Sequence, residues 1–447
     1  MNELEPALTL GEQHELNVAA ARMNVQDLSQ LEAFDGDTAR TMRNQIAMIP
    51  EMYSQGAIEI TPLTQRAPDV FYKDERQQVT GAFKPRGAFT NCWFTLENDP
   101  SVRELAACSA GNHAQGVGHF VNWHNTHFGW GLRAHAFIAE TASDAKKDSL
   151  RTQGAYIHDQ GLRSLEEARA AAQEFVRVSG RPAAEIQPYA APETIAGQGT
   201  IMTEIIMQLW EAGVDTRNQP LVVRVGWGGG GLALGTAEVI KQLISKGYAH
   251  PDSKVIAVEE QYNDSGRRGV ARYAEGGSTM HGLFAPGEFS ASNDGTAVQI
   301  ADLMNVAMAH RYSQEGLLEF DCVTKAQVGQ AMIENPGTEP AGALAIASHR
   351  QAAVRSLDSP LPLEVCVVSG GNLTEDKYTE YRQACEEAVV HRPNSLGGYV
   401  IHEHVVVENR NGYRAPEEVL AAYADQLSDW GVELLPESVQ RPAPPRQ

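Results

Sequence analysis

The sequence Thr80-Gly81-Ala82-Phe83-Lys84-Pro85-Arg86-Gly87-Ala88 places one lysine between a glycine-containing turn and a run that can begin a helix. The residues before Lys84 are apolar, so its ammonium group should lose part of its hydration. Desolvation disfavours the charged form and lowers the pKa of a lysine, which prepares the amine to form a Schiff base. From these residues alone, the alternative is a surface lysine whose aliphatic stem is buried.

Three further motifs follow along the chain: Ser109-Ala110-Gly111-Asn112-His113-Ala114-Gln115-Gly116, Gly228-Gly229-Gly230-Gly231-Leu232 and Ser369-Gly370-Gly371-Asn372. In this order and at this spacing, the four motifs resemble the pyridoxal-phosphate (PLP) enzymes of the tryptophan-synthase-β fold type, and most closely the threonine/serine dehydratases. The resemblance covers roughly Ile60 to Glu387. It implies PLP fold type II, an α/β fold of two lobes with largely parallel sheets flanked by helices.

Composition and charge narrow the class of protein. The chain has 447 residues, of which 42% are hydrophobic and 21% charged, as in globular proteins of two or three domains or one large two-lobed unit. With 57 acidic and 36 basic residues the net charge is −21, which disfavours nucleic acid and anionic membranes as partners. No stretch approaches the ~20 continuous apolar residues of a membrane helix.

Cysteine usage and the start of the sequence indicate a cytoplasmic protein. The five cysteines are odd in number and scattered, with no CxxC pair, which argues against a disulfide framework or a structural zinc site. The acidic segment Met1-Asn2-Glu3-Leu4-Glu5 lacks the basic and apolar regions of a signal peptide. We therefore expect a reducing compartment.

Buried strands are expected at 105–108, 134–138, 155–157, 221–225, 255–258 and 363–368, and helices from 112 onward, at 163–178 and at 233–245. This alternation predicts an α/β fold with largely parallel sheets. The predicted division is a helical arm (1–50), a large PLP-binding lobe (51–94 plus 199–390), a small inserted lobe that closes on the substrate (95–198) and a C-terminal extension (391–447). That extension does not resemble the effector-binding domain of biosynthetic threonine dehydratases.

The glycine run after the strand at 221–225 predicts phosphate binding. Gly226-Trp227-Gly228-Gly229-Gly230-Gly231 also satisfies GxGxxG, the dinucleotide fingerprint, and a turn without a ligand is the third interpretation. Amide groups of such a loop, with a helix N-terminus behind them, attract a single phosphate as well as a pyrophosphate. The resemblance assigns Gly228, Gly229, Gly230, Gly231 and Leu232 to the PLP phosphate, although Trp227 stands where a small residue is more usual.

The loop from Ser109 to Gly116 leads into a helix N-terminus, which suits an anion such as a carboxylate. Helix capping by serine and asparagine is the alternative. The resemblance places Ser109, Ala110, Gly111, Asn112 and His113 around the substrate carboxylate, with Asn112 also reaching the 3′ oxygen of the cofactor. Ala110 replaces the serine of the serine racemases in this family, so one-face elimination is favoured over racemisation.

Three more residues are assigned to the cofactor. Ser369 follows a predicted strand, where ligands bind in parallel sheets, although a turn serine has the same local sequence. By resemblance its hydroxyl meets the pyridine nitrogen, which makes the ring a weaker electron sink than an aspartate partner does and discourages transamination. The resemblance also assigns Phe83 and Glu339, and Glu339-Pro340 can equally mark the start of a helix.

Two parts of the sequence are candidates for metal binding. In the family a cation commonly lies behind the glycine loop, and Glu259 matches the acidic ligand. Because Ser265 stands where some magnesium-binding members have an acid, a divalent cation, a monovalent cation and none remain open. His113, His119, His124, His127 and His135 lack HExxH or other ligand spacing, which predicts surface or core histidines.

The segment that contains Trp123, Phe128 and Trp130 is a few residues longer than the family pattern. It could alter the substrate pocket or a subunit contact, and the sequence does not decide between them. By resemblance we expect a homo-oligomer, a dimer or a tetramer.

The resemblance implies dehydration and deamination of L-threonine or L-serine to a 2-oxo acid and ammonia, with Lys84 as the catalytic residue and general base. A β-replacement enzyme, or a lyase for diaminopropionate or hydroxyaspartate, would keep the same residues. An NAD-dependent oxidoreductase could use the glycine loop but would leave Lys84 and Ser369 without a task. A catalytically silent PLP-fold binding protein is the remaining alternative.

Overall fold

The computed structural model describes Tyr53 and residues 56–278, 280–293, 295–355, 362–390, 399–401 and 405–407. The arm predicted over 1–50 lies outside these ranges, as does most of the extension predicted over 391–447. Within these ranges, no helix combines the length and the apolar character that a membrane span requires.

The larger of two main sheets has six strands in the order β1-β2-β10-β7-β8-β9. Strand β1 runs antiparallel to β2, and all the other neighbours in this sheet are parallel. The strands are β1 Leu63–Ala67, β2 Val70–Asp74, β7 Leu221–Gly226, β8 Lys254–Glu260, β9 Leu318–Val323 and β10 Leu363–Val368. Its central strands are mostly apolar because helices cover both faces of the sheet.

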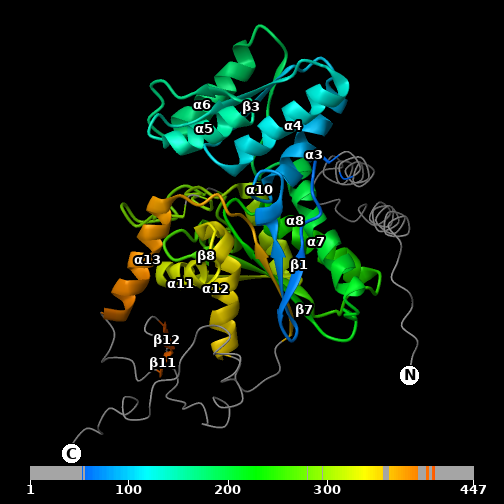
Figure 1. Cartoon of the computed structure of the whole chain (residues 1–447), viewed down its shortest axis with the longest axis vertical. Coiled ribbons are helices and arrows are strands. Elements are labelled where there is room, and N and C mark those ends of the chain that lie inside the picture. The colour runs from blue at the N-terminus through cyan, green and yellow to red at the C-terminus, as the bar shows by residue number, and fades with distance from the viewer. Residues whose placement is uncertain are drawn as a thin grey trace, which may run out of the picture.

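The smaller sheet is entirely parallel, with the order β5-β4-β3-β6. Figure 1 shows it with helices α4, α5 and α6 at one end of the molecule and the larger sheet at the other. Its strands and these helices are β3 Glu104–Cys108, α4 Asn112–Phe128, β4 Arg133–Phe137, α5 Asp144–Thr152, β5 Tyr156–His158, α6 Leu165–Val178 and β6 Ala183–Glu185. The predicted α/β class with two lobes and largely parallel sheets is confirmed.

Alternate residues of β7 pack against different helix layers. Val223 lies in the same core as Ile205 of α7 and Leu234 of α8. Val222 lies in a second core with Leu344 of α12. The remaining elements are η2 Glu75–Gln77, α3 Lys84–Asn98, α7 Pro192–Glu211, α8 Gly231–Ser245, α9 Ser265–Ala274, α10 Leu303–Gln314, α11 Lys325–Glu334, α12 Pro340–Arg355, α13 Glu375–Val390, β11 Tyr399–Ile401 and β12 Val405–Val407.

The predicted lobe boundaries both fall inside helices. The boundary at 94/95 lies within α3, and the boundary at 198/199 lies within α7, which packs against α3 and α8. Residues 104–185 contain all four strands of the smaller sheet. The exact division into lobes therefore stays a prediction.

Strand order brings three of the four motifs to one edge of the larger sheet. Strands β7 and β10 are parallel neighbours, so the glycine loop after β7 and Ser369 after β10 leave the sheet on the same side. Strand β2 pairs with the other side of β10 and leads through η2 to the Lys84 segment. In open parallel sheets this carboxyl edge is where ligands bind.

Buried charges hold the first turn of α3. The Arg86 Nε atom donates to Glu75 at 2.8 Å, and Nη1 donates to Glu204 of α7 at 2.6 Å. Lys73 Nζ also contacts Glu204 at 2.6 Å, and all four side chains are at most 7% exposed. Two cations and two anions thus compensate one another where water cannot reach them. This cluster fixes the helix turn that carries Lys84.

Candidate active site

Lys84 is the first residue of α3, and the segment before it is joined to the segment after β10. The Phe83 N–H donates to the Ser369 carbonyl at 3.0 Å, and the Gly371 N–H donates to the Gly81 carbonyl at 2.9 Å. Between these two bonds the segments form a short β-bridge. Main-chain hydrogen bonds therefore hold two segments side by side that lie almost 300 residues apart in the sequence. Lys84 and Ser369 belong to these two segments, so they lie on the same side of the larger sheet.

The Lys84 amine is held by a main-chain carbonyl of a third segment. Its Nζ donates to the Pro188 carbonyl at 3.1 Å and lies 5.0 Å from the centre of the Phe83 ring. Burial lowers the pKa of Lys84 to about 8, while the negative charge of Glu339 opposes the shift. The shift has the direction expected from the sequence, and it leaves a useful fraction of neutral amine near pH 8.

The glycine loop joins β7 to α8 and accepts no side chain at its centre. A Cβ built on Gly229 would lie 2.0 Å from Cγ of Tyr189, and Gly230 has a φ of 90°, which L side chains rarely adopt. Among the residues that the structure describes, no side chain caps the first turn of α8, so its amides face the loop with the positive end of the helix dipole. This is the geometry of a phosphate site.

Trp227 packs beneath the glycine loop and shapes it. Its side chain is buried at 1% exposure, and its ring would lie 2.6 Å from a Cβ on Gly230. The ring meets Phe320 of β9 edge to face, with 4.9 Å between ring centres. The large Trp227 side chain is therefore accommodated in the hydrophobic core below the loop, where a small residue is more usual.

The helix-capping interpretation of the Ser109 loop is wrong. Gly111 is the N-cap of α4, and within the described part of the chain no side chain bonds to the amides of its first turn. The Ser109 hydroxyl accepts from the Gly111 N–H at 3.2 Å, and the Asn112 side chain turns away to donate to Glu339 at 2.8 Å. The first turn of α4 therefore keeps amide donors for an anion.

Asn112, Glu339 and Asn372 form a hydrogen-bond chain that joins three of the four motifs, those of Lys84, Ser109 and Ser369. Asn372 Nδ2 donates to Asn112 Oδ1 at 2.7 Å and to the Thr80 carbonyl at 2.8 Å, and Asn112 donates in turn to Glu339. Glu339 precedes α12, so the predicted helix start after it is confirmed, and its N–H donates to the Gly370 carbonyl at 3.1 Å. Sequence reasoning gave Asn372 no role, although its place in the motif after β10 was a signal.

His113 is neutral and buried in the first turn of α4. Its Nε2 contacts the Ile186 carbonyl at 2.7 Å, and because a carbonyl only accepts, Nε2 carries the hydrogen. Burial, aided by the positive charge of Lys84, lowers the pKa of His113 to about 3. Its Nδ1 has no hydrogen-bond partner among the described residues and remains an acceptor. The predicted contact with the substrate carboxylate stays a prediction.

The Glu259 carboxylate accepts two hydrogen bonds from the main chain. Its two carboxylate oxygens accept from the Gly266 N–H at 2.8 Å and the Arg267 N–H at 3.0 Å. Burial raises the pKa of Glu259 to about 8, against the lowering effect of these two bonds. In the described ranges, no group of three or more His, Cys, Asp or Glu side chains could hold a metal ion. The predicted cation site gains no geometric support here.

The other histidines have structural contacts. His119 and His127 meet the carbonyls of Ala57 at 3.0 Å and Trp123 at 2.7 Å, and His135 meets Glu104 at 2.6 Å. The prediction of surface or core histidines is confirmed for these three.

The segment that is longer than the family pattern lies at the end of α4 opposite Asn112. Its aromatic residues Trp123, Phe128 and Trp130 are part of an aromatic cluster, so this segment does not line the predicted substrate site.

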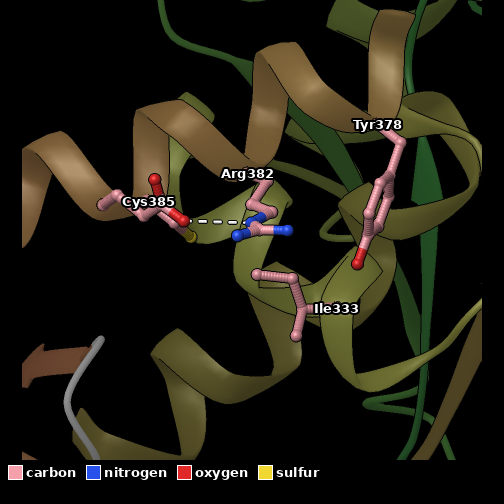
Figure 2. Close-up of a pocket in the computed structure, with 5 residues that line it drawn as sticks. Ile333, Tyr378, Arg382 and Cys385 are labelled. Atoms are coloured by element: carbon pink, nitrogen blue, oxygen red, sulfur yellow. Dashed lines mark hydrogen bonds and ion pairs between the residues drawn. The ribbon is translucent and has the colours of Figure 1, made fainter. Parts of the chain in front are cut away.

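A separate pocket of about 290 Å³ lies between α11 and α13 (Figure 2). Arg382 and Glu386, two of its lining residues, form an ion pair of 2.9 Å. It is lined by Ile333, Tyr378, Arg382, Cys385 and Glu386. None of the predicted site residues lines it, so it is distinct from the site around Lys84.

Comparisons with known proteins agree with the geometry around Lys84. The family model described as "Pyridoxal-phosphate dependent enzyme" matches residues 55–360. An L-threonine ammonia-lyase from Thermotoga maritima is 30% identical over 346 residues, which cover 75% of this chain and 74% of that protein. A β-hydroxyaspartate dehydratase from Paracoccus denitrificans is 32% identical over 207 residues, 46% of this chain and 58% of that protein.

A solved structure is similar over much of the chain. The processed form of threonine deaminase isoform 2 from Solanum lycopersicum superposes with a TM-score of 0.62 and 25% identity, covering 78% of this chain and 94% of that one. Because the family model spans most of this sequence, the chain belongs to the family of pyridoxal-phosphate dependent enzymes.

Proposed function

We propose that this protein is a PLP-dependent ammonia-lyase that converts L-threonine or L-serine to a 2-oxo acid and ammonia by α,β-elimination. The observation that carries the proposal is the convergence of Lys84, Asn112, Glu339 and the Ser369 segment through main-chain and side-chain hydrogen bonds. Three motifs separated by long stretches of sequence meet at the carboxyl edge of the larger sheet, and the bond between Asn372 and Asn112 joins the Ser109 loop of the smaller sheet to them.

The residues present fit the cofactor. Lys84 offers an amine with a pKa of about 8 for covalent attachment, and Gly228 to Leu232 offer the uncapped start of α8 to a phosphate. Ser369 at the end of β10 would meet the ring nitrogen, and Asn112 would meet the 3′ oxygen. Bound PLP supplies the electron sink that makes the Cα proton of an amino acid acidic.

The first turn of α4 would bind and orient the amino acid. Its amides and the Ser109 hydroxyl would supply the donors that a carboxylate accepts from, beside the positive end of the helix dipole. The chain Asn372–Asn112–Glu339 ties this turn to the larger sheet, so the substrate is held against Lys84. Fixed orientation of this kind is a large part of catalysis.

Lys84 would move the proton. Its Nζ would accept the Cα proton as a general base, and the pKa of about 8 suits this task near neutral pH. Ala110 has no hydroxyl to work on the opposite face of the substrate, which supports elimination over racemisation. The β-hydroxyl would then leave as water, taking up the proton that Lys84 Nζ received from Cα, and hydrolysis of the released enamine by a second water would give the 2-oxo acid and ammonia.

The finer expectations are part of the same proposal. We expect a cytoplasmic dimer or tetramer whose substrate is a small amino acid. A monovalent or divalent cation at Glu259 stays a prediction, tested by comparing activity with and without a chelator and with sodium exchanged for potassium. Hydroxyaspartate is a second candidate substrate, favoured by the similarity to the Paracoccus denitrificans dehydratase.

The decisive experiment is the visible spectrum of the purified protein, recorded before and after addition of L-threonine, L-serine, hydroxyaspartate and diaminopropionate. Release of 2-oxo acid and ammonia is assayed in parallel, without an added nucleophile. We expect a Schiff-base band that is lost in Lys84→Ala, with 2-oxo acid formed from threonine or serine. If the band responds only to another amino acid, that amino acid is the substrate and the assignment of the cofactor is unchanged. No band after reconstitution with PLP, or turnover by Lys84→Ala, would refute the proposal.

A further inference from the structure

Asn305 bridges two segments of the site and lies in none of the sequence motifs. It is the third residue of α10 and is buried at 1% exposure. Its Nδ2 donates to the Gly229 carbonyl at 2.5 Å and to the Tyr189 carbonyl at 3.0 Å. Its backbone is fixed as well, because Asp302 caps the helix and accepts from the Asn305 N–H at 3.3 Å.

The Pro188–Tyr189 segment that Asn305 anchors contacts both the glycine loop and the Lys84 amine. Tyr189 covers the glycine loop, and a Cβ on Gly229 would lie inside its ring. Pro188, the residue before it, accepts the hydrogen bond from Lys84 Nζ at 3.1 Å. Since peptide units are planar and adjacent Cα atoms are a fixed distance apart, anchoring the Tyr189 carbonyl restricts where the Pro188 carbonyl can lie.

We propose that Asn305 is a positioning residue, which holds the Pro188–Tyr189 segment against the glycine loop and thereby sets the direction of the Lys84 amine. The inference rests on the proposed function, since it assigns to one side chain the alignment of the lysine with the phosphate loop. Asn305 Oδ1 is buried and has no partner among the described residues, so the task lies with Nδ2 alone.

Asn305→Leu tests the proposal because leucine has the same number of side-chain heavy atoms as asparagine and offers no donor. Asn305→Asp is the second variant, since a carboxylate offers only acceptors to two carbonyls. The control is Met304→Leu, which changes a partly buried neighbour on the same helix that contacts the main core. Thermal unfolding is followed for all three, and the variant that folds as the wild type does is used.

Three experiments are made: a PLP titration, steady-state kinetics and chemical labelling of Lys84. The dissociation constant of PLP, from titration of the apoprotein, should rise about tenfold or more in the Asn305 variants, since the Gly229 carbonyl loses the donor that fixes the phosphate loop. At saturating PLP, kcat should fall about tenfold or more, while the KM for L-threonine changes less than about twofold, because Asn305 does not touch the Ser109 loop. In the apoprotein, acetic anhydride should label Lys84 about threefold faster relative to Lys254, since the amine loses its fixed acceptor.

Two results would overturn the inference. One is an Asn305 variant that matches Met304→Leu in PLP affinity, kcat and Lys84 labelling. The other is a change confined to KM, which would indicate a role in substrate binding. A wild-type protein that neither binds PLP nor forms 2-oxo acid would refute the proposed function instead, and the Lys84 labelling of the apoprotein would still report on Asn305 directly.

Discussion

Replacement of Glu339 by glutamine should lower the pKa of Lys84 further below its value of about 8. The Glu339 carboxylate is the opposite charge that raises the pKa of Lys84 against the effect of burial. Glutamine removes this charge, yet its side-chain oxygen can still accept from Asn112 Nδ2, as Glu339 does at 2.8 Å. The variant therefore changes the electrostatics of the lysine while keeping the hydrogen-bond chain to Asn372.

The size of the effect of burial follows from the shifted pKa. With a pKa of about 8, about one-tenth of the Lys84 amines in the apoprotein are neutral at pH 7. An ordinary lysine, with a pKa of about 10.4, has roughly 200-fold less neutral amine at that pH. Since only the neutral amine attacks an aldehyde or an anhydride, Lys84 should react far faster at pH 7 than the exposed lysines do. Glu339→Gln should widen this difference.

The assay is competitive labelling of the apoprotein with acetic anhydride from pH 6 to 11, with the modified lysines quantified by mass spectrometry. Glu315→Gln is the control, because it removes one negative charge from a carboxylate that contacts Lys241 and Arg311 instead. We expect a Lys84 midpoint near 8 that moves to lower pH in Glu339→Gln alone. A wild-type midpoint above about 10 would refute the burial argument. An unchanged or higher midpoint in Glu339→Gln would refute the role of its charge.

Three further outcomes are expected. Gly229→Ala should weaken PLP binding by about tenfold or more in a titration, since its Cβ would enter the Tyr189 ring, whereas Gly180→Ala, with no atom within 4 Å of its Cβ, should not. Arg86→Met should lower the free energy of unfolding in guanidinium chloride by about 3–5 kcal/mol, because two buried carboxylates lose their shared cation. Lys84→Met should be more stable than the wild type at pH 7 by about 1–3 kcal/mol. The folded pKa of Lys84 is depressed, so the unfolded state binds more protons between pH 8 and about 10.4, and this gain should vanish as the pH rises through that window.

Much of the site could be predicted because its functional residues lie in short local motifs. A glycine run after an apolar strand, a lysine at a helix start and a serine after a strand each carry a local signal, and the structure has β7, α3 and β10 at these places. The helix-capping alternative for Ser109 and Asn112 was wrong because capping depends on where a side chain turns. Asn112 turns to Glu339, which is 227 residues away along the chain.

Residues whose contribution is a hydrogen bond with the main chain could not be predicted from a local motif. Pro188 contributes only a carbonyl to Lys84, and Asn305 contributes one amide nitrogen to two carbonyls. Neither residue belongs to a motif whose residue types indicate a catalytic or binding role. The buried cluster of Arg86 with two glutamates was equally hidden, because charged residues are usually exposed and only the fold brings these together.

The sequence by itself determined the fold class, the cofactor family and the order of the motifs, because alternating apolar strands and helices and the glycine and lysine motifs are local patterns. Only the tertiary structure decided which amides stay uncapped, which carbonyl receives Lys84 Nζ and how strongly its ammonium form is disfavoured. These properties arise from contacts between segments that are distant in the chain, and from burial that depends on all of them at once.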